Sequence, residues 1–129
     1  MLRRAIALVE DDPHILALLD DLLKEEGYRT LAIPKGGTAH ATITREQPDL
    51  VILDLWLERQ DMGWKIYDQL RANDVTADIP VIICSADVAT VRSRTAAIAA
   101  RGDAMMEKPF DIAALLATIT DLLARVPVA

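Results

Sequence analysis

The chain has 129 residues, 52% of them hydrophobic and 4% aromatic, with a formal net charge of -6. This length suits a single domain over residues 1–129, and the acidic balance argues against a nucleic-acid-binding module, which needs a basic surface. No apolar run approaches the roughly 20 residues of a membrane span. The N-terminus does not have the pattern of a signal peptide, so we expect a cytoplasmic location.

The first half of the chain alternates short apolar runs with segments of helical periodicity. Residues 5–9 and 50–53 are apolar runs bounded by turn signals, which is typical of strands buried on both faces. A more mixed run at 28–33 predicts a strand nearer the edge of the sheet. One predicted helix begins at Pro13, stops at Gly27 and carries a stripe of leucines that includes Leu18. A second helix is predicted over residues 38–47.

The second half continues the alternation. A helix over 64–73 precedes a fourth apolar run at 80–84, and an alanine-rich helix follows over 88–101. A short strand at 103–107 and a last helix over 112–125 complete the chain. Five strand–helix repeats predict an α/β fold, in which helices cover both faces of a doubly wound, five-stranded parallel sheet.

Polar residues follow four of the predicted strands at the point where each strand ends. Glu10 and Asp11 follow the first strand, Asp54 the third, Ser85 the fourth and Lys108 the fifth. Each residue alone is compatible with a helix cap, a turn or a solvated surface. In a parallel sheet, however, the carboxyl ends of the strands share one edge, where ligands collect. These polar residues come from four separate parts of the chain, and their expected convergence at this edge favours a functional site.

The residue types at this edge indicate phosphoryl chemistry. Clustered carboxylates disfavour one another's ionisation, and a divalent cation relieves that repulsion. An all-oxygen donor set suits Mg²⁺ or Mn²⁺. A carboxylate beside such a metal can attack phosphorus and form an aspartyl phosphate. The Lys108 ammonium and the Ser85 hydroxyl would then neutralise the remaining phosphoryl oxygens.

Four stretches, in order, resemble the receiver domain of two-component response regulators and together extend over the whole chain. They are residues 9–13, 48–55, 81–86 and 107–110. The resemblance implies a flavodoxin-like receiver fold with strand order 2-1-3-4-5 and a cis peptide bond between Lys108 and Pro109.

The resemblance also implies a role for each residue at the edge. Asp54 would be the phosphoacceptor, contacted by the Ser85 hydroxyl and the Lys108 ammonium. A domain of this kind assists its own phosphorylation and dephosphorylation but is a signalling domain, not an enzyme. The ligands of Mg²⁺ (or Mn²⁺) would be Glu10, Asp11, Asp54 and the backbone carbonyl of Trp56.

Because we expect no output domain after the receiver, the resemblance implies a single-domain response regulator. A histidine kinase or histidine phosphotransferase would supply the phosphoryl group. The signal would leave through phosphorylation-dependent binding of a downstream protein or through onward phosphotransfer. The expected partner surface, which is also the candidate homodimer surface, covers residues 88–125 and includes Val91, Arg92, Arg94 and Thr95. The same mixture of residues also suits an ordinary, partly solvated helix face.

Four features depart from the usual receiver pattern. Glu58 stands where a proline usually follows the phosphoacceptor, and the loop from Asp54 to Gly63 is one residue longer than usual. Met105 stands at the position of the usual switch aromatic, so the switch itself is an open question. Trp56 is a bulky neighbour of the acceptor, which either covers apolar surface or, as we hypothesise, shields the phosphoryl group from water.

Other protein classes with similar elements fit less well. A haloacid-dehalogenase-type phosphatase expects a second Asp two residues after the nucleophile, where this chain has Trp56. A flavodoxin-like electron carrier needs a Ser/Thr/Gly-rich phosphate loop after the first strand, where this chain has acids at 10–12. The main alternative is a pseudo-receiver, which is a protein-binding module whose state does not depend on phosphorylation.

Overall fold

The computed structural model describes residues 3–57 and 62–125, and Glu58 of the sequence analysis lies outside them. Five parallel strands form one sheet in the order β2-β1-β3-β4-β5, which confirms the predicted topology. The strands are β1 (Ala5–Val9), β2 (Arg29–Ile33), β3 (Leu50–Asp54), β4 (Val81–Ser85) and β5 (Ala104–Glu107).

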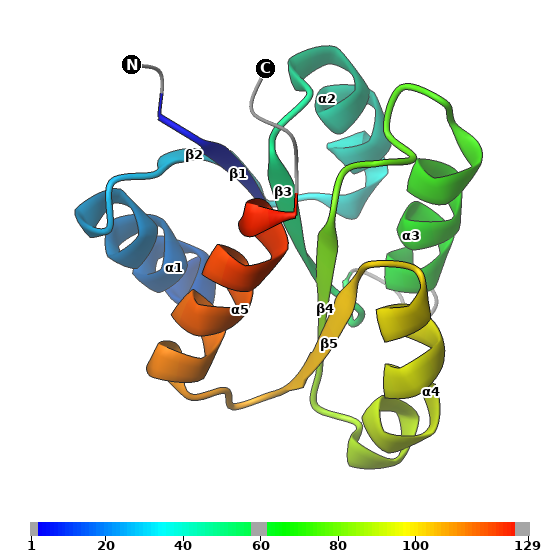
Figure 1. Cartoon of the computed structure of the whole chain (residues 1–129). Helices are drawn as coiled ribbons and strands as arrows, with labels where there is room; N and C mark the ends of the chain where they lie inside the picture. Colours follow the sequence, from blue (N-terminus) through cyan, green and yellow to red (C-terminus); the bar gives the residue numbers. More distant parts are fainter. Residues whose placement is uncertain (1–2, 58–61, 126–129) are drawn as a thin grey trace.

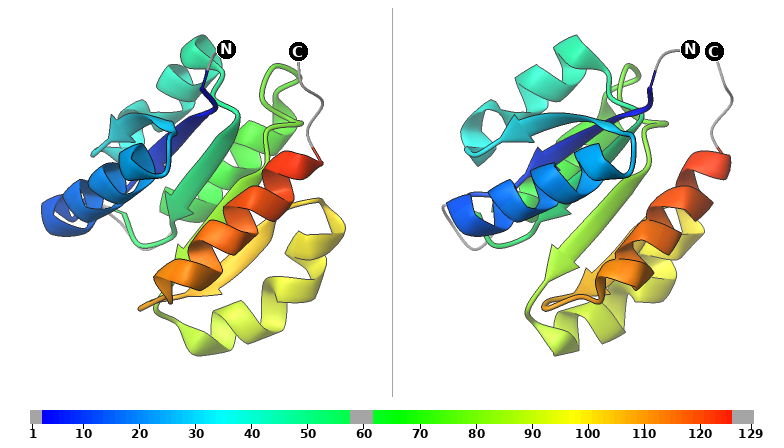
Figure 2. Two further views of the ribbon diagram at one scale, coloured as in Figure 1. Left: turned by 60° about the vertical axis from the view of Figure 1, so that its left-hand side comes forward. Right: turned by 90° about the vertical axis from the view of Figure 1, so that its left-hand side faces the viewer.

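Helices cover both faces of this sheet (Figures 1 and 2). In the described residues no helix has the length and apolar character needed to cross a membrane. One core lies under α1 and α5, and the other lies under α2, α3 and α4. The helices are α1 (Pro13–Glu25), α2 (Ala39–Glu46), α3 (Met62–Ala72), α4 (Val88–Ala100) and α5 (Ile112–Ala124), with a 3₁₀ turn, η1 (Gly36–Thr38), before α2.

Strand side chains fill the cores on both faces of the sheet. Successive strand residues point to opposite faces, so Val51 and Leu53 enter the core under α3, whereas Leu50 and Ile52 enter the core under α1 and α5. Every residue of β3 and of β4 is buried. Burial on both faces explains why these strands are unbroken apolar runs.

Some side chains lie elsewhere than their sequence pattern indicates. Leu18 belongs to the predicted leucine stripe of α1 but is 59% exposed, because the sheet covers only one side of the helix. Val91, which we assigned to the partner surface, is buried and belongs to the core under α4. The second helix begins one residue later than predicted, at Ala39, because the preceding residues form the 3₁₀ turn.

Asp103 lies just before β5 and organises a polar network at the amino end of the sheet that the sequence analysis did not predict. It is buried. Its carboxylate accepts hydrogen bonds from the Tyr67 hydroxyl (2.6 Å), the Val81 amide (2.8 Å) and Arg71 Nη2 (3.2 Å). Arg71 also donates to the carbonyls of Ala77 and Ile79. This Asp103 network ties α3 to the starts of β4 and β5.

Candidate functional site

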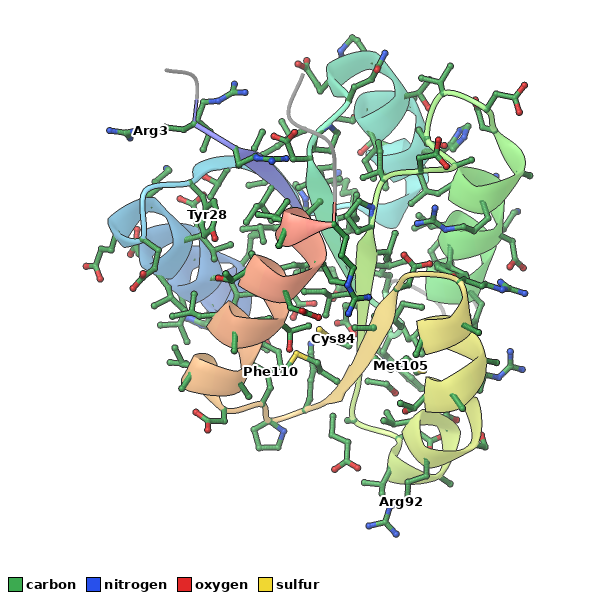
Figure 3. The ribbon with its side chains drawn as sticks, viewed as in Figure 1. Arg3, Tyr28, Cys84, Arg92, Met105 and Phe110 are labelled. Carbon is green, nitrogen blue, oxygen red and sulfur yellow. The ribbon has the colours of Figure 1, made fainter. Side chains whose placement is uncertain are left out.

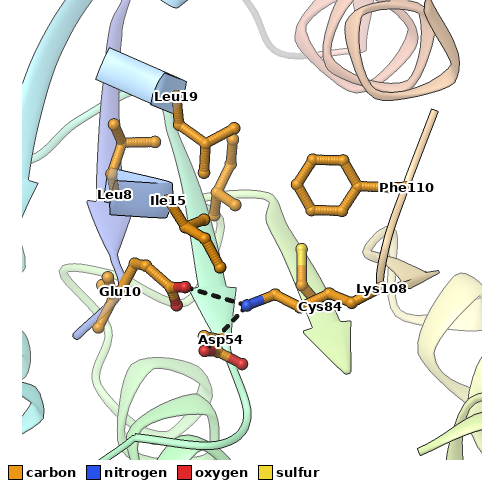
Figure 4. Close-up of a pocket in the computed structure, with 10 residues that line it drawn as sticks. Leu8, Glu10, Ile15, Leu19, Asp54, Cys84, Lys108 and Phe110 are labelled. Atoms are coloured by element: carbon orange, nitrogen blue, oxygen red, sulfur yellow. Dashed lines mark hydrogen bonds and ion pairs between the residues drawn. The ribbon is translucent and has the colours of Figure 1, made fainter. Parts of the chain in front are cut away.

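Glu10, Asp54 and Lys108 meet at the carboxyl edge of the sheet (Figure 4). Lys108 Nζ donates to Asp54 Oδ2 at 3.0 Å and to Glu10 Oε1 at 3.1 Å. One ammonium therefore bridges two carboxylates that come from different strands. The sequence analysis predicted this convergence, and the geometry confirms it.

The strand ladders set these positions. Glu10 follows β1 directly, and its amide donates to the Ile33 carbonyl at 3.2 Å. Asp54 is the last residue of β3. Lys108 follows β5, where its amide donates to the Ser85 carbonyl at 2.8 Å, and its bond to Pro109 is cis, as predicted. The charged groups thus extend from backbone that the sheet holds in place.

Burial and mutual repulsion dominate the electrostatics of the site. The Glu10 and Asp54 side chains are almost fully buried. Burial, followed by the hydrogen bond and charge of Asp54, raises the pKa of Glu10 to about 8, and the opposing effect of Lys108 is smaller. Burial alone would lower the pKa of Lys108, but the Asp54 and Glu10 carboxylates outweigh burial, so its pKa is raised. With the neighbouring Asp11, three carboxyl groups gather at a site that contains one ammonium.

The donor set of the site fits a magnesium ion. Carboxylate oxygens of Glu10, Asp11 and Asp54 lie within 4.8 Å of one another. Glu10 Oε2 is buried and has no hydrogen-bond partner among the described residues, although buried polar atoms are normally paired. Oxygen ligands in this number, with one unpartnered, suit Mg²⁺ together with several water molecules.

Ser85 and Trp56 lie beside the Asp54 carboxylate. The Trp56 amide donates to Asp54 Oδ1 at 3.1 Å, while its indole is 65% exposed. Ser85 is buried, and its Oγ accepts a hydrogen bond from the Asp87 amide at 3.0 Å. A hydroxyl that accepts in this way keeps its own proton to donate. Trp56 and Ser85 both line a depression next to the acceptor, together with Trp64, Asp87 and Thr90.

An apolar chamber lies behind the bridging lysine. Its lining includes Ile15, Leu19, Phe110 and the buried Cys84 (Figure 4). Burial raises the pKa of the Cys84 thiol to about 12, so this cysteine is a packing residue and not a nucleophile. These apolar side chains line the same pocket as Glu10 and Lys108.

Gly63 brings α3 into direct contact with the end of β3. A Cβ atom at this position would lie 2.4 Å from the Leu55 Cα and 2.8 Å from the Asp54 carbonyl oxygen. The Gly63 amide donates to the Leu55 carbonyl at 3.3 Å. No side chain fits in this space, so the start of α3 is fixed against the backbone of the candidate acceptor.

Sequence reasoning missed several residues around the site. Asp87 is the N-cap of α4, where its carboxylate accepts from the Thr90 amide. The Asp-x-x-Thr spacing at the start of a helix is a detectable capping pattern. Trp64 and Phe110 line depressions on either side of the site, and no local sequence pattern indicates this, because it depends on how the helices cross the sheet.

The family model for the response regulator receiver domain matches residues 6–120. The DNA-binding dual master transcriptional regulator RpaA of Synechocystis is 33% identical over 120 residues, which cover 93% of this chain and 49% of RpaA. The transcriptional regulatory protein PrrA of Mycobacterium tuberculosis is also 33% identical over 120 residues, covering 93% of this chain and 50% of PrrA. The chain thus spans about half the length of these relatives.

Solved structures agree with this match. The BeF₃-activated N-terminal receiver domain of Klebsiella pneumoniae RstA has a TM-score of 0.77 and 27% identity, covering 95% of this chain and all of that one. The receiver domain of sensor histidine kinase PA1611 of Pseudomonas aeruginosa, which holds a magnesium ion in its active-site cleft, shares the fold with a TM-score of 0.81 and 24% identity, over 95% of this chain and 99% of that one. The chain belongs to the response regulator receiver domain family of two-component systems.

Proposed function

We propose that Asp54 accepts a phosphoryl group from a histidine kinase or histidine phosphotransferase in a magnesium-dependent reaction. The phosphorylated chain then binds a protein partner or passes the phosphoryl group onward. The observation that supports this proposal is the Lys108 ammonium, which bridges Asp54 and Glu10 at the carboxyl edge. In this proposal Asp54 is the nucleophile beside that cation, and a bound metal would balance the remaining carboxylate charge once Glu10 is ionised.

The transfer is an in-line displacement at phosphorus. A carboxylate oxygen of Asp54 forms a bond to phosphorus as the phosphorus–nitrogen bond of phosphohistidine breaks. The electron pair of that bond stays on the imidazole, which takes up a proton. Such a reaction needs mainly positioning and neutralisation of the phosphoryl oxygens. Lys108 would contact one of these oxygens, and the Ser85 hydroxyl would donate a hydrogen bond to another.

The proposed metal ligands are Glu10, Asp11, Asp54 and the backbone carbonyl of Trp56. A bound Mg²⁺ would supply positive charge to the phosphoryl oxygens. The unpartnered Glu10 Oε2 supports this assignment. Because Glu10 holds a proton below its raised pKa of about 8, it must release that proton before it binds the ion.

We further propose that the receiver acts as a single-domain regulator in the cytoplasm and signals through the surface of α4, β5 and α5. Arg92, Arg94 and Thr95 of α4 are exposed and available to a partner or to a second copy of the chain. Because the curated relatives are about twice as long, an intact mass of the protein from its source is the measurement that tests the single-domain proposal. Light scattering with and without beryllofluoride tests the homodimer.

The phosphoacceptor proposal is tested by incubating the protein with Mg²⁺ and acetyl phosphate and measuring its intact mass. We expect the addition of one phosphoryl group. Asp54→Asn should gain none, and wild type in EDTA should gain none. Asp121→Asn, which changes an exposed acid on α5, should behave like wild type. A folded wild-type protein that gains no phosphoryl group would contradict the proposal and favour the pseudo-receiver.

A further inference from the structure

Trp64 stands between the candidate phosphorylation site and α4. On one side it lines the depression that also contains Ser85 and Asp87. On its other side it lines a groove between α3 and α4, together with Arg94. Because Trp64 follows Gly63, which is pressed against the end of β3, the backbone that carries the indole is held close to the acceptor. Among the described residues, Trp64 alone lines both this depression and this groove.

Aromatic rings of α3 and arginines on or next to α4 hold the two helices together. The Arg94 guanidinium lies over the Trp64 ring, 4.6 Å from its centroid. The Arg101 guanidinium lies 5.8 Å from the centroid of the Tyr67 ring. Contacts of this kind are attractive and, at exposed positions, weak enough to break and re-form. The link between α3 and α4 is therefore reversible.

Few other side chains fix α4. Among its thirteen residues only Val91 and Ile98 are buried, whereas α5, of the same length, buries four. Met105 of β5 packs in the same core as these two residues, and Figure 3 labels it near α4. An unbranched thioether adapts its shape to a moving neighbour. A small displacement of α4 therefore costs less than a displacement of α5.

The first turn of α4 is connected to Ser85. The Asp87 amide donates to Ser85 Oγ at 3.0 Å, and the Asp87 carboxylate accepts from the amide and hydroxyl of Thr90. If Ser85 Oγ turns toward a phosphoryl group on Asp54, the Asp87 amide must follow it or lose its acceptor. Movement at the acceptor thus reaches the helix that Arg94 holds against Trp64.

We propose that Trp64 is the aromatic residue that couples the state of Asp54 to α4. In the unphosphorylated chain Arg94 lies over the indole. When Ser85 turns toward the phosphoryl group, the loop between β4 and α4 shifts, and Arg94 leaves Trp64. The coupling is an equilibrium between two arrangements that phosphorylation biases through the Ser85 contact. This inference rests on the proposed function, because it requires a phosphoryl group on Asp54.

Tryptophan fluorescence tests the coupling directly, because the chain contains two tryptophans, Trp56 and Trp64. In Trp56→Phe the emission comes from Trp64 alone. We expect Mg²⁺ with beryllofluoride to raise the acrylamide quenching constant of this variant, because the indole loses the guanidinium that covers it. If Trp56→Phe does not fold, the difference between wild type and Trp64→Phe isolates the same emission.

Two arginines of one helix provide the matched comparison. In the Trp56→Phe background, Arg94→Gln should show the raised quenching constant without beryllofluoride and no further rise with it. Arg92 belongs to the same helix but points away from the body of the molecule (Figure 3), so Arg92→Gln should keep the full response. A destabilised helix would change both variants alike, whereas the proposed contact changes only the first.

Intact mass after treatment with acetyl phosphate separates the two proposals. If the Trp56→Phe variant gains a phosphoryl group but its quenching constant does not change with beryllofluoride, the coupling through Trp64 is overturned. Equal responses of Arg92→Gln and Arg94→Gln overturn it as well. If wild type gains no phosphoryl group, the proposed function itself has failed.

Discussion

Two buried acids lie at opposite edges of the same sheet, and they differ in their hydrogen-bond partners. Asp103, at the amino edge, accepts three hydrogen bonds from described neighbours, including one from Arg71. Glu10, at the carboxyl edge, shares a single lysine with Asp54, and its Oε2 has no partner in the described part of the chain. One carboxylate is fully partnered and the other is not.

This comparison separates the two acids by their hydrogen bonding and not by their burial, because both are buried. Burial raises the pKa of both carboxyls. At Asp103 the neighbouring donors offset part of that effect, whereas at Glu10 the adjacent Asp54 adds to it. An unpartnered buried oxygen is costly to the folded state, and a bound cation would remove the cost. The Asp103 network stabilises the fold without a ligand, whereas the proposed metal ion would stabilise the Glu10 site.

The largest expected effect is the loss of the Asp103 carboxylate. Asp103→Ala leaves the Tyr67 hydroxyl and the Val81 amide without their acceptor and Arg71 without its carboxylate partner, and we expect the free energy of unfolding to fall by about 3–5 kcal/mol. Urea denaturation measures this. The matched change at the other edge, Asp54→Asn, removes a charge that repels Glu10, and should leave metal-free stability within about 1 kcal/mol of wild type. Equal losses in the two variants would refute the comparison.

The second effect is a pH dependence caused by Glu10. Its pKa is 4.5 in the unfolded chain and about 8 in the folded protein, so between these values the folded state holds a proton that the unfolded state has released. The free energy of unfolding without metal should therefore fall as the pH rises from 5 to 8, by at most about 1.4 kcal/mol per pH unit. Thermal or urea unfolding at several pH values measures the slope.

The control for this pH dependence is Glu10→Gln, which should flatten the slope by removing the titrating group. The contribution of Asp103, whose pKa is also raised, is present in both proteins and cancels in the difference. Added Mg²⁺ should stabilise wild type more at pH 8 than at pH 6, because binding requires the ionised carboxylate. A wild-type slope that matches that of Glu10→Gln would count against the raised pKa.

The smallest expected effect concerns Trp56, which lies beside the acceptor but is largely exposed. If its indole shields a phosphoryl group, Trp56→Ala should shorten the lifetime of the acyl phosphate by a factor of a few, less than about 1.4 kcal/mol in the barrier. Loss of phosphoryl mass over time measures the lifetime. Leu18→Ala, at an exposed apolar residue on α1, should leave the lifetime unchanged, and an unchanged lifetime in Trp56→Ala would remove the shielding hypothesis.

The sequence predicts the carboxyl edge better than the amino edge for a physical reason. Glu10, Asp54 and Lys108 follow strands directly, so the topology of a parallel sheet is enough to bring them together. The partners of Asp103 come from a helix and a different strand, and their pairing has no periodicity that a sequence pattern could reveal. The exposed Leu18 shows a second limit, because periodicity indicates a helical stripe but not how much of it the sheet covers.

The close approach at Gly63 also constrains how the loop after β3 can vary in length. The Gly63 backbone lies directly against Leu55 and the Asp54 carbonyl oxygen. This contact sets the position of the first turn of α3. A change in the length of the preceding loop would therefore leave the start of the helix in place, whereas replacing Gly63 by alanine should displace it.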